Sequence, residues 1–161
     1  MQTIGRTFLA LLMLFGGTQL VSAQDGEGQE RLEGVWQVTT TPRNCVTGVP
    51  IPTTPFEFLF TFHKGGTMSA SLQNLTITIT RSPGHGLWQR EHGRGDYSFK
   101  FVHLRYDLAT GAFLGSQVAR GTLRLSESGD QFTTNSQNQV FDVNGHLTIT
   151  SCANSVGTRF E

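Results

Sequence analysis

The sequence lacks every short motif that would identify an enzyme directly. It has no Gly-x-Ser-x-Gly nucleophile motif, no phosphate-binding Gly-rich loop and no dinucleotide-binding fingerprint. It also lacks any run of basic residues, and its 12 Lys and Arg residues balance its 12 Asp and Glu residues. Proteins that bind nucleic acid or anionic membrane surfaces normally carry a basic surplus. We therefore exclude both partners and assign no catalytic residue.

Long apolar runs are missing except near the start of the chain. The apolar run at 8–15 is too short to span a bilayer comfortably and is interrupted by Gly16-Gly17, with no stop-transfer signal after it. Val21-Ser22-Ala23 then has the small-x-small pattern of a signal-peptidase site, so an uncleaved anchor is the weaker interpretation. We predict a signal peptide at 1–23, a polar disordered arm at 24–31 and one domain at 32–161. The mature chain is expected to be periplasmic or extracellular and not inserted in a membrane.

Cysteine is scarce, with Cys45 and Cys152 as the whole complement. No Cys-x-x-Cys spacing exists that would suggest a metal or redox site. In an exported protein a disulfide between the two is the expected state, and two free buried thiols are the alternative. The chain-entropy model values closure of a loop of roughly 100 residues at about 4–5 kcal/mol.

Helical periodicity is missing too, and almost every patterned segment alternates with period two. The clearest case is 56–62, where four Phe residues share one face. Turn signals separate the segments, including His63-Lys64-Gly65-Gly66 and Asn144-Gly145. We expect strands in the following segments, the penultimate one with a bulge: 32–41, 56–62, 67–72, 75–80, 97–106, 113–125, 131–143 and 147–159.

Consecutive strands with short turns predict an all-β fold, a single antiparallel meander closed into a β-barrel of roughly eight strands. Closure brings the first and last strands together, and two residue pairs agree with this arrangement. Pairing Trp36 with Arg159 and pairing Cys45 with Cys152 require registers that differ by a single side-chain period. One first-to-last strand pairing therefore accommodates both contacts.

Gly34-Val35-Trp36 near the start and Arg159 on the final strand resemble the calycin superfamily, which comprises lipocalins and related barrels. That resemblance implies that Trp36 closes one end of the barrel and that Arg159 packs across it as a structural closure. The chain departs from lipocalins because it has no Thr-Asp-Tyr-type motif in its middle. The Ser82-Pro83-Gly84-His85-Gly86-x-Trp88 segment, with Gly111 and Gly157-Thr158-Arg159-Phe160, resembles small exported bacterial barrels without assigned function. A fainter similarity in layout is to allene-oxide-cyclase-like barrels.

The predicted barrel interior is the main candidate for a binding site. Small inward residues on 113–125 face the Phe stripe of 56–62, and an eight-stranded barrel is just wide enough for one small ligand. The alternative is that the Phe residues simply fill the barrel, with small residues interleaved. The inward face of 97–106 is expected to add a tyrosine, an imidazole and a guanidinium, unless the opposite phase is inside. The candidate ligand-binding residues are Phe58, Phe60, Trp88, Tyr97, Phe99, Phe101, His103, Arg105 and Gln117.

The segment 81–95 is rich in Gly, His and charge, and we interpret it as a loop with Trp88 tucked into the barrel mouth. His85 and His92 do not have a recognised metal-ligand spacing, so we predict no metal. Haem has no supporting distal signature either, so we predict no cofactor.

These observations favour an exported, monomeric barrel that binds a small apolar or amphipathic molecule. Two alternatives remain at this point. One is a cyclase or isomerase in which the cavity shapes an apolar substrate, with polarity from Tyr97, His103 and Arg105. The other is a filled barrel that meets another protein through the 81–95 loop.

Overall fold

The computed structural model describes residues 32–73 and 78–160. The predicted signal peptide and polar arm lie outside the described residues, as do 74–77, which cover part of the strand expected at 75–80. Within the described ranges, no helix is long and apolar enough to cross a membrane.

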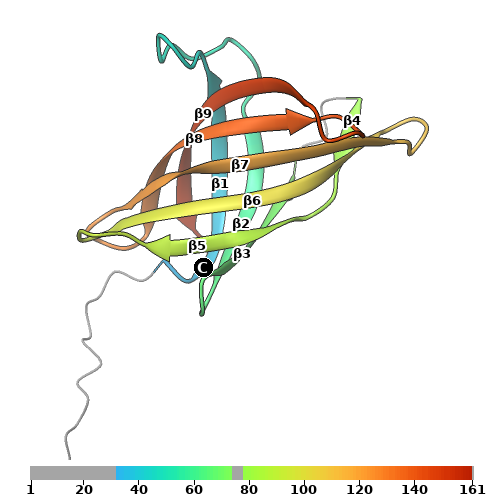
Figure 1. Ribbon diagram of the computed structural model, residues 1–161. Helices are drawn as coiled ribbons and strands as arrows, with labels where there is room; N and C mark the ends of the chain where they lie inside the picture. The colour runs from blue at the N-terminus through green and yellow to red at the C-terminus, as the bar shows by residue number, and fades with distance from the viewer. Residues whose placement is uncertain (1–31, 74–77, 161) are drawn as a thin grey trace, which may run out of the picture.

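One antiparallel sheet contains all the strands of the described residues (Figure 1). The strands are β1 (Gly34–Arg43), β2 (Phe56–His63), β3 (Thr67–Leu72), β4 (Ile79–Arg81), β5 (Gly84–Arg90), β6 (Asp96–Asp107), β7 (Phe113–Leu125), β8 (Gln131–Phe141) and β9 (Leu147–Arg159). Each strand except β4 pairs on both sides, and β1 lies between β2 and β9. The predicted all-β fold is therefore confirmed as a closed eight-stranded meander barrel with one extra short strand.

The segment predicted as a loop at 81–95 is mostly strand, and this expectation was wrong. β5 pairs with β3 and with the first part of β6, while β4 pairs with the far end of β6. The two short strands therefore lie one after the other along the same side of β6. The alternation of β5 is hard to see because two of its inward positions are glycine. At Gly86 a Cβ atom would lie 2.1 Å from the Lys100 carbonyl oxygen, so the strands approach too closely for any side chain.

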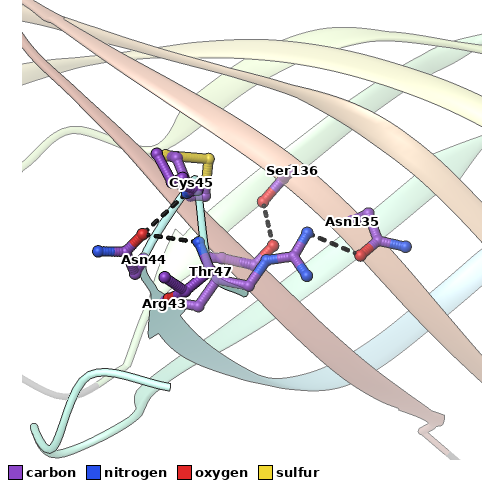
Figure 2. The surroundings of a disulfide bond; sticks show 9 residues. Arg43, Asn44, Cys45, Thr47, Asn135 and Ser136 are labelled. Atoms are coloured by element: carbon purple, nitrogen blue, oxygen red, sulfur yellow. Dashed lines mark hydrogen bonds between the residues drawn. A yellow bond between two sulfur atoms is a disulfide. The ribbon is translucent and has the colours of Figure 1, made fainter. Parts of the chain in front are cut away.

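The first and last strands pair in the predicted register. Trp36 is opposite Arg159, and the ladder continues to Arg43 opposite Cys152. Cys45 follows two residues beyond that last pair and forms a disulfide with Cys152, with a Cα–Cα distance of 5.1 Å (Figure 2). The β1–β9 ladder and the disulfide together close the barrel where its first and last strands meet, which we call the barrel seam.

One end of the barrel is closed by a packed floor. Trp36 is fully buried, its indole nitrogen donates to the Leu32 carbonyl, and the Arg159 guanidinium carbon lies 4.3 Å from its ring centroid. The Arg159 guanidinium also donates to the backbone carbonyls of Gly129 and Glu33. Other floor residues from neighbouring strands complete this end: Phe62, Met68, Trp88, Tyr97, Leu123, Leu125 and Phe132.

The inward face of each long strand follows the period-two pattern. On β6 the buried residues are those in phase with Phe99 and Phe101, and the opposite positions Val102 and Leu104 are 42% and 41% exposed. The phase expected inward for 97–106 is therefore confirmed. On β8 the inward phase continues without a slip through its polar centre, and the predicted bulge lies between Val140 and Phe141.

Candidate functional site

A cavity of about 300 Å³ occupies the end of the barrel opposite the floor. It is lined by residues from seven strands: β1, β2, β4, the part of β6 from Phe99 to Arg105, β7, β8 and β9. Its lining residues are Thr40, Pro42, Phe56, Phe58, Phe60, Ile79, Arg81, Phe99, Phe101, His103, Arg105, Gln117, Ala119, Ser136, Asn138, Val140, Ile149, Ser151, Cys152, Ala153 and Ser155. The volume is at the small end of the range for sites that hold organic ligands.

The apolar wall of the cavity is aromatic. Phe60 meets Phe101 edge-on at 5.5 Å between ring centroids, and Phe99 stacks on Phe101 at 6.1 Å. Phe58 and Phe60 are 5.7 Å apart on β2. Space remains beside these rings because the position opposite Phe101 on β7 is Ala119, whose side chain ends at Cβ. Small residues interleaved with large ones thus leave a void here instead of filling the barrel.

Hydroxyl and amide groups line the opposite wall, on β1, β8 and β9. Several of them already have partners: Thr40 and Ser155 share a hydrogen bond of 2.9 Å, and the Ser136 hydroxyl donates to the Ala153 carbonyl. These bonds fix the orientation of the wall and satisfy groups that would otherwise be costly to bury. A molecule in the cavity therefore meets aromatic rings on one side and oriented polar groups on the other.

Two guanidinium groups, those of Arg81 and Arg105, lie at the outer end of the cavity. Arg81 on β4 is directly opposite Arg105 on β6, and both side chains line the cavity. The guanidinium carbon of Arg81 lies 5.4 Å from the Phe56 ring centroid, and its Nε is buried without a hydrogen-bond partner. Burial and the nearby Arg105 charge both lower the pKa of Arg81. Among the described residues, none that lines the cavity is an Asp or Glu.

His103 lies one inward position deeper than Arg105 on β6 and is 3% exposed. Its pKa is lowered to about 4, mainly by burial and further by the Arg81 and Arg105 charges, although a hydrogen bond with Gln117 acts in the opposite direction. The imidazole is therefore neutral at pH 7. Its Nε2 atom is buried and has no partner among the described residues.

This pKa shift predicts a specific loss of stability in mild acid. Between about pH 6.5 and pH 4 the unfolded state takes up a proton at His103 that the folded state resists, so the free energy of unfolding falls as pH falls. The total loss is expected to reach about 3 kcal/mol near pH 4 and then level off. Urea denaturation at successive pH values measures it.

The matched variant for this prediction is His103→Gln, which removes the titrating group and keeps a polar side chain beside Gln117. The difference between the wild-type and variant curves isolates His103 from surface carboxylates that titrate at lower pH. A difference that stays constant from pH 7 to pH 4 would show that the imidazole is not held neutral by burial.

The structure brings seven of the nine predicted ligand-binding residues to the cavity wall: Phe58, Phe60, Phe99, Phe101, His103, Arg105 and Gln117. It places the other two in the floor. Trp88 packs between Phe62 and Tyr97, with ring centroids 6.0 and 5.6 Å away, so neither Trp88 nor Tyr97 reaches the cavity. Trp88 therefore does not lie at the barrel mouth.

Sequence reasoning missed Arg81 and the polar wall. Arg81 was assigned to the 81–95 loop because of the Gly, His and charge content of that segment, whereas it is the last residue of β4. Ser136 and Asn138 are in phase with the buried Phe132 and Val140, and that phase was the available signal for inward polar groups.

In the part of the chain that the structure describes, no group of three or more His, Cys, Asp or Glu residues is placed to hold a metal ion. The chemistry present in the cavity is instead two cationic donors, one neutral imidazole, several amides and hydroxyls, and five phenyl rings. Such a set can bind and orient a small molecule that is polar at one end.

No protein-family model, no curated protein and no solved structure matches this chain.

Proposed function

We propose that this protein is an exported barrel that binds a small amphipathic molecule in its cavity. The observation that carries the proposal is the cavity itself: an aromatic wall beside buried polar atoms that have no partner in the described residues, on Arg81 and His103. Native proteins rarely leave buried polar groups unsatisfied, because each costs about 1–3 kcal/mol. A ligand that supplies the missing hydrogen bonds recovers that free energy.

The architecture supports this proposal. A closed barrel with a packed floor at one end and a cavity at the other forms a cup, and the Trp36–Arg159 closure is the feature by which the sequence resembles calycins. We propose a calycin-like binding protein that acts as a monomer. The disulfide is compatible with an oxidising compartment outside the cytoplasm.

Native mass spectrometry of the protein purified from its own host tests the proposal. We expect a fraction of the protein to carry one small organic molecule, released on denaturation and identifiable in the extract. Protein that carries no adduct, and whose cavity in an experimental structure is filled by its own side chains, would contradict a binding function.

An isomerase or cyclase is the second candidate, and one observation favours it. His103 presents a neutral imidazole to the cavity next to Arg105, which is a suitable state for a general base. Tyr97, which was expected to join them, lies in the floor. A catalyst would turn over the molecule found in the extract, and His103→Gln would lower kcat for that molecule by a larger factor than it lowers the binding affinity.

A further inference from the structure

The arrangement of the two arginines is unfavourable unless something negative lies between them. Side chains at directly paired positions of an antiparallel ladder project to the same face, and like charges there destabilise the sheet. Arg81 and Arg105 are such a pair, and both project into the cavity. The nearest acid along β6 is Asp107, which accepts hydrogen bonds from Thr110 in the β6–β7 turn. Among the described residues, neither arginine has a carboxylate within ion-pair distance.

His103 supplies an independent indication of a ligand at the same place. His103 lines the cavity and is only 3% exposed, and its Nε2 is buried without a hydrogen-bond partner among the described residues. A neutral imidazole nitrogen accepts a hydrogen bond from an O–H or N–H group, and a protonated one donates to an anion. A ligand group that forms a hydrogen bond with His103 would therefore be polar and would lie beside the arginines. The polar end of a ligand would therefore sit near Arg81, Arg105 and His103, towards the mouth.

The rest of the ligand would meet the aromatic wall deeper in the barrel. Phe101 and Phe99 follow His103 inward on β6, and Phe60 faces Phe101 from β2. Phenyl rings prefer edge-on or offset contacts with another aromatic ring. At about 300 Å³ the cavity suits a compact body in preference to a long flexible chain.

We propose that the ligand is a compact aromatic carboxylate, bound as its anion, with the carboxylate at the Arg81–Arg105 pair and the ring against Phe60 and Phe101. The planar guanidinium fork matches a carboxylate in two parallel hydrogen bonds, and such charge-assisted bonds are about twice as strong as neutral ones. This inference rests on the proposed binding function and names its ligand class.

A matched pair of probes tests the inference by isothermal titration calorimetry at pH 7. The probes are 2-naphthoate and its neutral analogue 2-naphthamide, which have nearly the same shape and differ in charge. We expect the wild-type protein to bind the carboxylate at least about tenfold more tightly than the amide, which corresponds to about 1.4 kcal/mol. In Arg105→Gln and Arg81→Gln the preference should fall to about threefold or less.

The control is Arg120→Gln, the same substitution at an exposed position of β7, where the guanidinium donates a hydrogen bond to the Gln139 side-chain oxygen. It should keep the wild-type preference. Arg81→Gln and Arg105→Gln without ligand should be at least as thermally stable as wild type, because each removes a like-charge repulsion. A loss of preference that comes with a loss of stability would indicate a structural role and overturn the assignment.

The two proposals fail in different ways. Equal affinity for the carboxylate and the amide in the wild-type protein would overturn the anion inference and leave the binding function standing. Absence of binding by both probes would overturn the aromatic carboxylate as the ligand class, and the native mass spectrum, which does not depend on the probes, would still decide the binding function.

Discussion

Replacing Ala119 with tryptophan should weaken the binding of 2-naphthoate by about 100-fold or more. Ala119 is buried on β7, opposite Phe101, and its Cβ points into the cavity. An indole at this position would occupy the space that the ligand needs. Adding bulk to a well-packed core costs about 1–3 kcal/mol, but here an existing void accommodates part of the ring, so the fold should persist. Calorimetric titration measures the affinity, and circular dichroism follows thermal unfolding.

The matched control is Val118→Trp on the same strand. Val118 belongs to the opposite phase, and its register partner Val102 is 42% exposed on the outer face of the barrel. This variant should bind 2-naphthoate as the wild-type protein does. If Ala119→Trp folds and retains full affinity, the ligand binds elsewhere and the cavity is not the site.

The second large effect is expected from removal of the disulfide. Cys45 and Cys152 are 107 residues apart in the chain, and loss of such a cross-link restores conformational freedom to the unfolded state. A double Cys45→Ser, Cys152→Ser variant should lose about 2–5 kcal/mol of unfolding free energy, measured by urea denaturation. Adding a reductant should destabilise the wild-type protein similarly and leave the variant unchanged.

We expect loss of the disulfide to change the cavity as well as the stability of the fold. Asn44 accepts backbone hydrogen bonds from Val46 and Thr47, and Arg43 donates to Asn135 on β8 (Figure 2). Cys152 itself lines the cavity. We expect the reduced protein to bind 2-naphthoate more weakly even at temperatures where it remains folded. An unchanged denaturation midpoint after removal of the bridge would contradict its stabilising role.

The strands that were predicted well are those whose inward positions carry large apolar side chains. The Phe stripe of β2 and the Phe99–Phe101 face of β6 reveal both the strand and its inward side, because burial of each Phe is worth about 1.5–3 kcal/mol. The barrel seam was predictable for a different reason. Trp36 and Arg159 are distinctive residues, and the ladder register that pairs them agrees with the disulfide.

The features that were missed have inward positions without an apolar signal. Two inward positions of β5 are glycine, Gly84 and Gly86, so its alternation shows no hydrophobic pattern in the sequence. The polar wall of β8 reads as an outward face until its phase is tied to Phe132 and Val140. Whether the barrel contains a cavity was not predictable, because a filled barrel and a barrel with a cavity have the same alternation of inward and outward residues along each strand. The answer depends on which side chains meet across the interior.

Backbone NMR of the protein titrated with 2-naphthoate tests the central claim, that the interior of the barrel is the binding site. The account predicts shift changes concentrated on the cavity strands, at Phe58–Phe60 on β2 and Phe99–Arg105 on β6, with little change in the floor around Trp36. A second hollow lies on the outer face of β1, β2 and β9, beside Leu59, Val156 and Phe160. Shift changes confined to that outer face would contradict the account.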